Sequence, residues 1–224
     1  MYSIKNKIRG TFNVVSSNEV SLCDLANKYN PSVEFGKYTY ITPHVSNEKI
    51  INKICQTVHP VGIAASCIIP SDVESKKMLT NNCLYLDRLS DPGNVGTLLR
   101  SAAWFGVKNI ALSKECADVF NPKVVRGAMG AHFLLTIVRN MDLSEFVNDE
   151  YCIIGADQNG SSIYDFKNNK DKWVLVIGNE ANGISKASRK NIQHFLSIPA
   201  IGSGNSLNAA VAGSILIHQL VNYK

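Results

Sequence analysis

The sequence predicts an α/β fold in which helices cover both faces of a mostly parallel sheet. From residue 83 onward, short apolar runs alternate regularly with segments of helical spacing. The runs are apolar at consecutive positions, which is typical of strands that are buried on both faces. Helices between successive strands favour parallel pairing through crossover connections.

Six apolar runs are the expected strands of this sheet. Clear examples are Cys-Leu-Tyr-Leu-Asp at 83–87 and Trp-Val-Leu-Val-Ile-Gly at 173–178. Each run has the length of a strand rather than of a helix. In chain order the six span residues 83–87, 109–113, 134–138, 151–156, 173–178 and 194–198.

Start and stop signals locate the first two helices of this region. One helix is expected over 94–105, where Asn94 would be its cap and Gly106 is placed to end it. Another begins at Asn121 and Pro122, because proline suits the first position of a helix. Both helices follow a predicted strand, as crossover connections require.

Two further helices complete the alternation. Asp142 and Glu145 have the spacing of a capping box and indicate the start of a short helix. A long apolar helix is expected over about 206–221, capped by Ser206 or Asn208. This helix would be the last element of the fold.

Residues 1–70 have a different pattern and are expected to form a small α/β domain of their own. Helical spacing occurs at 20–30 and at 48–58, and an apolar strand is expected at 62–69. The polar stretch over 71–82, rich in Ser, Lys and Asn, is interpreted as the linker to the domain at 83–224.

Composition favours a soluble cytoplasmic protein. The chain has 224 residues, 45% hydrophobic content and a net charge of +5. No apolar run approaches the roughly 20 residues that a membrane span needs. The basic N-terminus is not followed by the apolar stretch of a signal peptide. The mild positive charge is compatible with RNA but also with many other partners.

The loop after the first strand carries the first candidate site residues. Asp91-Pro92-Gly93 is expected to form a tight turn, after which Asn94 would cap the helix and Arg100 would lie about two turns further on. The alternative is an ordinary capped helix with a solvated arginine. The segment alone does not decide between these two interpretations.

A second loop, Gly178-Asn179-Glu180-Ala181-Asn182-Gly183, directly follows the strand at 173–178. Gly178 would let a ligand approach the end of the strand, and Glu180 would supply a carboxylate. The alternative is a turn with an exposed glutamate. The pattern is Gly-x-Glu-x-x-Gly and therefore differs from the dinucleotide-binding fingerprint.

A third loop, rich in Gly, Ser and Asn, joins the strand at 194–198 to the last helix. It runs from Ile198-Pro199 to Ser206-Leu207-Asn208. Small residues allow the backbone to come close to a ligand, although a flexible turn before a capped helix is the simpler alternative. Because all three loops follow the carboxyl ends of strands, we expect them to form one shared site.

Several other classes of site are disfavoured by the sequence. The five histidines and six cysteines show no metal-ligand spacing, so no metal site is expected. A Gly-x-Ser-x-Gly nucleophile elbow and a Gly-x-x-x-x-Gly-Lys-Ser/Thr phosphate loop are both missing from the sequence.

The three loops together resemble the motifs of the SpoU (TrmH-type) RNA 2′-O-ribose methyltransferases of the SPOUT superfamily. The similar patterns are Asn94-x-Gly96-x-x-x-Arg100, Gly178-x-Glu180-x-x-Gly183 and Ile198-Pro199…Ser206-Leu207-Asn208. Residues 121–131 also look like the segment between the first two motifs of that family. The resemblance covers roughly 83–222, and the combination of motifs is far more specific than any one of them.

The resemblance implies a fold, a cofactor and partners. The fold would be a knotted α/β domain with a C-terminal trefoil knot, working as a homodimer. The cofactor would be S-adenosylmethionine, held among the three loops. Residues 59–65 look like the end of a small ribosomal-protein-like module that binds RNA in many members. By this resemblance, the cofactor-binding residues are Ile177, Gly178, Glu180, Gly183, Ile198, Ser206, Leu207 and Asn208.

The implied activity is transfer of a methyl group to a ribose 2′-hydroxyl of ribosomal or transfer RNA. The catalytic residues would be Arg100, Asn94, Glu180 and Asn208. In the family Arg100 is assigned to deprotonation near the partner subunit's cofactor, but a guanidinium is normally a permanent cation. The alternative is that Arg100 grips a phosphate and stabilises the developing alkoxide.

Two other functions remain as alternatives at the level of the sequence. One is a non-catalytic RNA-binding protein that retains the fold, which the intact motif residues argue against. The other is a different adenine-nucleotide enzyme on a doubly wound sheet, which the missing phosphate-binding fingerprints disfavour.

Overall fold

The computed structural model describes residues 11–12, 65–66, 72, 79–148, 150–168, 170–204 and 206–222. Two short strands, β1 (Thr11–Phe12) and β2 (Ala65–Ser66), pair in antiparallel fashion. β2 falls within the strand expected at 62–69. The helices expected at 20–30 and 48–58 lie outside the described residues, and the domain boundaries at 70 and 82 stay predictions.

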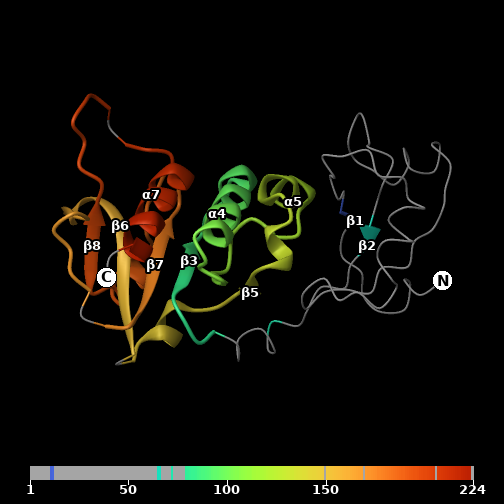
Figure 1. The fold of residues 1–224 in the computed structure, drawn as a ribbon, viewed down its shortest axis with the longest axis horizontal. Coiled ribbons are helices and arrows are strands. Elements are labelled where there is room, and N and C mark those ends of the chain that lie inside the picture. Colours follow the sequence, from blue (N-terminus) through green and yellow to red (C-terminus); the bar gives the residue numbers. More distant parts are fainter. Residues whose placement is uncertain are drawn as a thin grey trace.

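A six-stranded sheet forms the centre of the described domain (Figure 1). Its strand order is β5-β4-β3-β7-β6-β8, and every pairing is parallel. The predicted parallel sheet is therefore confirmed. Its strands are β3 (Cys83–Asp87), β4 (Asn109–Leu112), β5 (Thr136–Val138), β6 (Tyr151–Ser162), β7 (Lys172–Gly178) and β8 (His194–Ser197).

Alternate residues of each strand supply two separate hydrophobic cores. In β3, Leu84 and Leu86 belong to one core, whereas Cys83 and Tyr85 belong to the other. This alternation follows from the two-residue period of a strand. Burial on both faces explains why the strands read as continuous apolar runs.

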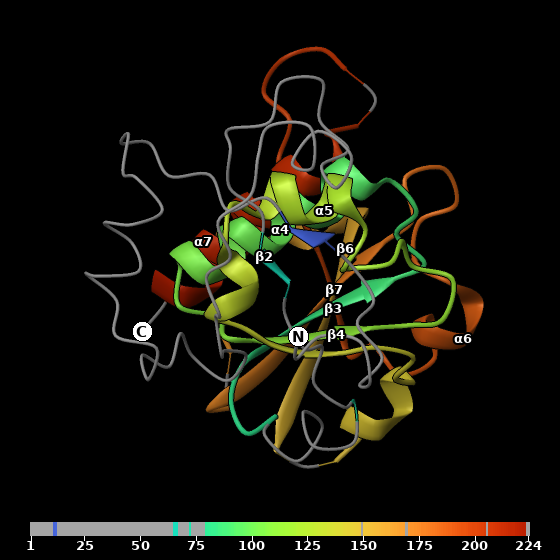
Figure 2. The same ribbon diagram turned by 90° about the vertical axis from the view of Figure 1, so that its right-hand side faces the viewer.

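Helices cover both faces, as predicted, but unequally. α4 (Pro92–Trp104), α5 (Pro122–Ala128) and α7 (Ala209–Asn222) cover the core that contains Leu84. Figure 2 shows these three helices together on one side of the sheet and α6 on the other. The second core is covered by two short elements, the 3-10 helix η3 (Leu143–Phe146) and the region of α6 (Lys186–Arg189).

The N-cap of the first helix lies three residues before the predicted one. Asp91 is the N-cap, and its carboxylate accepts a hydrogen bond from the Asn94 amide nitrogen at 2.8 Å. The prediction that Asn94 caps α4 is therefore wrong. Pro92 suits the first turn because its fixed φ is helical and it has no N–H to satisfy. Gly106, at a φ of 78°, follows the end of the helix as expected.

The remaining helix signals give mixed results. Asn121 and Asp142 are the N-caps of α5 and η3, as predicted. Asn208, rather than Ser206, caps α7, since its side-chain oxygen accepts from the backbone N–H groups of Ala210 and Val211. The strand expected from residue 134 begins at 136, because η2 (Ala131–Phe133) precedes it and Leu134 is the C-cap of η2. α6 was not predicted.

α4 and α5 approach each other closely at a pair of glycines. A Cβ atom on Gly96 would lie 2.7 Å from the Val124 carbonyl oxygen and 3.0 Å from the Gly127 Cα. A Cβ on Gly127 would meet Gly96 at an ordinary 3.4 Å. Gly96 is therefore required for helix packing, which gives a physical reason for a glycine in the first motif.

Replacement of Gly96 by Ala is expected to destabilise the fold by about 1–3 kcal/mol, because the added methyl group overlaps backbone atoms of α5 that cannot move independently. Gly127→Ala is the matched control and should be neutral or stabilising, since alanine favours a helix. Chemical denaturation of both variants measures the difference. Equal unfolding free energies would contradict this account of the helix contact.

His132 is a buried histidine in η2. Its Nε2 lies 2.7 Å from the Val119 carbonyl oxygen, and its side chain faces the ring of Phe120. Burial lowers the pKa of His132 below its ordinary value of 6.5, although the hydrogen bond to Val119 opposes this. The neutral imidazole is thus the form that the folded protein favours.

This burial predicts a loss of stability in mild acid. Because the folded pKa of His132 lies below the unfolded value, its contribution is complete above pH 6.5 and falls as the pH drops below that value. The slope cannot exceed about 1.4 kcal/mol per pH unit for one group. Unfolding measured between pH 7.5 and 5 should show a shallower decline for His132→Gln, and parallel curves would refute the assignment.

Candidate active site

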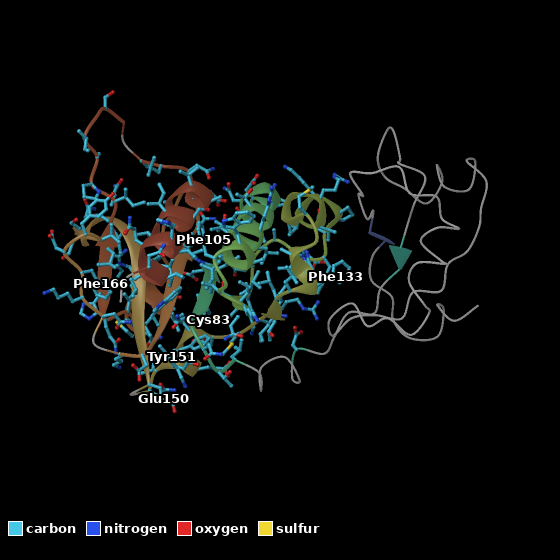
Figure 3. All side chains as sticks on the ribbon, viewed as in Figure 1. Cys83, Phe105, Phe133, Glu150, Tyr151 and Phe166 are labelled. Carbon is cyan, nitrogen blue, oxygen red and sulfur yellow. The ribbon has the colours of Figure 1, made fainter. Side chains whose placement is uncertain are left out.

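The site lies where the chain leaves the two central strands of the sheet. Asp87 ends β3 and is the register partner of Gly178, which ends β7. The loops that follow therefore start side by side at the carboxyl edge, where open α/β sheets bind ligands. In Figure 3, Cys83 and Tyr151, which begin β3 and β6, lie away from the projecting segment that follows β8.

Three predicted site residues meet in one hydrogen-bond chain. The Asn208 Nδ2 donates to the Asn94 Oδ1 at 2.9 Å, and the Asn94 Nδ2 donates to the Glu180 Oε1 at 2.8 Å. These residues come from the first, second and third motifs. The structure thus joins loops that are 86 and 114 residues apart in sequence.

The chain of hydrogen bonds has a fixed direction. The Asn208 Oδ1 accepts from the Ala210 and Val211 backbone N–H groups at 2.9 and 3.2 Å, so the Asn208 amide nitrogen must face Asn94. An amide has one acceptor end and one donor end. The Asn94 nitrogen is consequently directed at the Glu180 carboxylate.

Glu180 collects further donors from the first loop. Its carboxylate accepts from the Asp91 backbone N–H at 3.4 Å and from the Ser90 hydroxyl at 3.5 Å. These long contacts are weaker than the 2.8 Å bond from Asn94. Glu180 is exposed, so its remaining acceptor positions face solvent. The carboxylate therefore connects the first and second loops at the open edge of the sheet.

Asn179, which the sequence analysis did not single out, holds the second loop in shape. Its backbone exchanges hydrogen bonds with Gly183 in both directions, and its Oδ1 accepts from the backbone N–H groups of Ala181 and Asn182. Its Nδ2 donates to the Arg88 carbonyl oxygen at 3.0 Å. Asparagine favours such local turns, which was the available signal.

Asp87 is a second residue that sequence reasoning missed. It is 2% exposed, and its carboxylate accepts from the Ser185 backbone N–H at 2.6 Å. A buried carboxylate is tolerated when it is hydrogen-bonded. Asp87 therefore fixes the end of the second loop against β3. A single acidic residue at the end of an otherwise apolar strand was its only sequence signal.

The two glycines of the second motif are required for reasons other than the predicted approach of a ligand. A Cβ on Gly178 would overlap the backbone of Gly183 and Ile184, so the loop itself occupies the space that was expected for a ligand. Gly183 has a φ of 62° with open space around it, so it serves the left-handed conformation. Close approach by a ligand is therefore not needed to explain either glycine.

Arg100 lies apart from the hydrogen-bonded residues. It is exposed on α4 and makes no hydrogen bond or ion pair with the described part of the chain. Six residues separate it from Asn94, which corresponds to about 9 Å along the helix axis. Arg100 and Trp104 share one face of α4, because they are four residues apart. Trp104 is 83% exposed.

The third loop presents apolar side chains to solvent. It follows β8, runs to α7 and projects beyond the carboxyl edge of the sheet in Figure 1. Leu207 is 52% exposed, and Ile198 is half-buried against the core. Ser206 is exposed. Ile177, by contrast, is 2% exposed and its side chain lies in the core, so only its backbone can face the site.

The fold is that of a class of α/β enzyme domains that bind ligands at the carboxyl edge of a parallel sheet, and the joined loops lie at this edge. The model of the SpoU rRNA Methylase family matches residues 81–218, more than half of the chain. The chain belongs to this family. The match includes all three motifs that meet in the hydrogen-bond chain.

Individual relatives agree with this assignment. A 23S rRNA (guanosine(2553)-2′-O)-methyltransferase of Bacillus subtilis is 34% identical over 188 residues, which cover 81% of this chain and 73% of the relative. The AdoMet-bound SpoU methyltransferase AviRb from Streptomyces viridochromogenes has a TM-score of 0.64 at 29% identity, covering 73% of this chain and 69% of that one.

A further solved structure is similar to this fold. The AdoMet-bound rRNA methyltransferase from Sinorhizobium meliloti has a TM-score of 0.69 at 27% identity and covers 77% of this chain and 69% of that one. Both this structure and that of AviRb contain AdoMet.

Proposed function

We propose that this protein transfers a methyl group from S-adenosylmethionine to a ribose 2′-hydroxyl of ribosomal RNA. The observation that carries the proposal is the hydrogen-bond chain from Asn208 through Asn94 to Glu180, which unites the three family motifs at one edge of the sheet. Relatives that are named as 23S rRNA 2′-O-methyltransferases support ribosomal RNA over transfer RNA.

The residues at this edge suit the proposed cofactor. Exposed Leu207 and half-buried Ile198 offer apolar surface for an adenine ring, and the backbone near Gly178 and Ser206 offers polar groups. Glu180 can attract the cationic end of the donor, while Gly183 and Ile177 shape the adjoining backbone. A trefoil knot that includes the third loop would enclose the cofactor. This knot stays a prediction from the resemblance.

S-adenosylmethionine, when bound, supplies an activated sulfonium methyl group, so the protein has mainly to position the hydroxyl and assist loss of its proton. The positively charged Arg100 would assist by binding a phosphate of the substrate or by stabilising the developing alkoxide. Asn94 and Asn208 order the site around Glu180. Their arrangement is rigid because each amide is held at both ends.

We also infer that two copies act together. The exposed face of α4 carries Arg100 and Trp104, and the adjoining helix α7 exposes Val211 at 47%. α4 and α7 contact one another through the Ser101 and Ser214 hydroxyls at 2.7 Å. Exposed apolar side chains on two packed helices are typical of a homodimer interface. An Arg100 on this face would reach the site of the partner.

Substrate selection is assigned to residues 1–70, as the family resemblance of residues 59–65 suggests. Among the described residues, no helix is long and apolar enough to cross a membrane. A cytoplasmic location, where ribosomal RNA is accessible, fits this activity.

The decisive experiment is transfer of labelled methyl groups from S-adenosylmethionine to 23S rRNA transcribed in vitro. The expected product is one ribose-methylated nucleotide, located by resistance to alkaline cleavage. RNA binding without label transfer, despite measured cofactor affinity, would favour the non-catalytic RNA-binding alternative. Thermal stabilisation by other adenine nucleotides, but not by S-adenosylmethionine, would favour the second alternative.

Asn208 caps α7 and donates a hydrogen bond to Asn94, and Asn208→Asp should separate these two roles. Aspartate still caps α7, so the unfolding free energy should change by less than about 0.5 kcal/mol. The new carboxylate cannot donate to the Asn94 Oδ1, which leaves Asn94 between two carboxylates. Loss of a hydrogen bond in a charged network predicts roughly tenfold or greater loss of turnover or cofactor affinity.

Calorimetric titration with S-adenosylmethionine and single-turnover assays measure this effect. Asn208→Ala is the comparison, because it removes both the cap and the donor and should lose stability as well as activity. Full activity of Asn208→Asp would show that the hydrogen-bond chain is dispensable.

A further inference from the structure

Arg88, the residue directly after β3, adopts a backbone conformation that is unusual for arginine. Its φ is 55°, in the left-handed region that glycine and asparagine favour. Its neighbours hold it there, since its N–H donates to the Ser113 Oγ at 2.8 Å and its carbonyl oxygen accepts from the Asn179 Nδ2 at 3.0 Å. A glycine at this position would adopt the same conformation without strain.

These contacts place Arg88 at the centre of the carboxyl edge. Ser113 follows β4 and Asn179 follows β7, and these strands lie on either side of β3. Ser90, two residues after Arg88, has its hydroxyl 3.5 Å from the Glu180 carboxylate. Arg88 is therefore connected through its backbone to the loops that form the proposed active site.

The Arg88 side chain carries an unmet hydrogen-bonding requirement. Its Nε is buried and has no hydrogen-bond partner within the described part of the chain. Buried polar groups are nearly always paired, so an orphan donor needs an explanation. Two other described arginines have carboxylate partners: Arg139 bonds to Asp72 and Arg189 bonds to Asp157. Arg88 is half-buried as a residue and has no such carboxylate partner within the described part of the chain.

We propose that Arg88 binds a backbone phosphate of the RNA substrate beside the ribose that is methylated. This inference rests on the proposed function and adds a substrate-positioning residue to it. A guanidinium offers a planar fork of donors that matches a phosphate in bidentate geometry. Every ribose within an RNA chain is flanked by phosphates, so a nucleotide at this edge would bring an anion to Arg88. The nearby carboxylates of Asp87 and Glu180 already accept other hydrogen bonds.

Arg88→Gly is a sharp test, because it removes the cation while relieving the left-handed strain. We expect its unfolding free energy to stay unchanged or rise. The KM for 23S rRNA transcribed in vitro should increase by roughly tenfold or more, as expected for a lost hydrogen-bonded charge. The salt dependence of RNA binding should weaken by about one phosphate contact.

Two controls distinguish a specific contact from a general loss of charge. Lys108 is an exposed cation just before β4, at the opposite edge of the sheet, so Lys108→Ala should leave the KM nearly unchanged. Arg88→Lys keeps the charge but loses the fork, and it should give an intermediate KM. Affinity for S-adenosylmethionine alone, measured by calorimetry, should stay within about twofold in all variants because no RNA phosphate is involved.

The outcomes separate this proposal from the proposed function. RNA affinity and salt dependence that are unchanged in Arg88→Gly would overturn the inference, even if methyl transfer is observed. Weaker cofactor affinity with unchanged RNA affinity would overturn it too, because Arg88 would then hold the cofactor carboxylate. Arg88-dependent RNA binding without methyl transfer would support this contact while refuting catalysis. Failure of the wild-type protein to bind RNA would refute both.

Discussion

Replacement of Arg100 by Ala should reduce methyl transfer by about two to four orders of magnitude without unfolding the protein. The side chain is exposed and has no hydrogen-bond or ion-pair partner in the described part of its own chain, so its removal should change stability by less than about 0.5 kcal/mol. The loss would therefore be catalytic. Single-turnover transfer to 23S rRNA measures it, with cofactor affinity as the internal control.

Arg126→Ala is a suitable control variant, because Arg126 is also an exposed helical arginine. It should retain far more activity than Arg100→Ala. Arg100→Lys tests the chemistry: substantial residual activity would favour a simple cationic role, whereas complete loss would favour the planar fork. A wild-type rate in Arg100→Ala would remove this residue from the mechanism.

The same variant tests whether Arg100 acts across a dimer. Mixing Arg100→Ala with a variant that cannot bind the cofactor creates hybrid dimers with one complete site, if the arginine serves the partner. Random pairing would then restore about a quarter of wild-type activity from two inactive proteins. No recovery after verified subunit exchange would indicate that Arg100 acts within its own chain.

Gly178→Ala should supply that second inactive variant. Its Cβ would overlap the backbone of Gly183 and Ile184, so the second loop must move and carry Glu180 with it. We expect cofactor affinity to fall by about 100-fold and stability to fall by about 1–3 kcal/mol, because the overlap involves backbone rather than flexible side chains. Gly202→Ala is the control, since Gly202 has open space around it.

Calorimetry with S-adenosylmethionine measures the first effect and chemical denaturation the second. Retention of wild-type affinity by Gly178→Ala would show that the tight return of the loop is not needed for cofactor binding. A comparable loss in Gly202→Ala would point to the third loop as the more sensitive segment.

Local patterns were sufficient to predict most of the sheet. β3 begins and ends where its predicted run does, because all five of its residues are buried and its one polar residue, Asp87, is the last. β6 was predicted to end at 156 but extends to Ser162, with a shift in its pairing to β8 between Ala156 and Ser161. Such an irregularity depends on the neighbouring strand and has no signature in the sequence of β6 itself.

The sequence predicted which residues form the candidate site better than it predicted how they contact one another. Motif resemblance identified Asn94, Glu180 and Asn208, but their hydrogen bonds span distances in sequence that no local pattern reports. Asn94 was predicted to cap α4, but Asp91 is the cap, because Pro92 fixes the start of the helix. The buried state of Asp87 and the orphan Nε of Arg88 depend on tertiary packing and could be found only in the folded chain.

The dual role of Asn208 has a consequence for the order of biosynthesis. Because Asn208 caps α7 and also donates to Asn94, the hydrogen-bond chain of the site is incomplete until α7 has docked. A nascent chain that is released from the ribosome before α7 has been synthesised would contain the first two motifs. It would lack Asn208, which joins the third motif to them. Competence to modify RNA is therefore acquired late in synthesis, so truncated translation products should not methylate the ribosomes that made them.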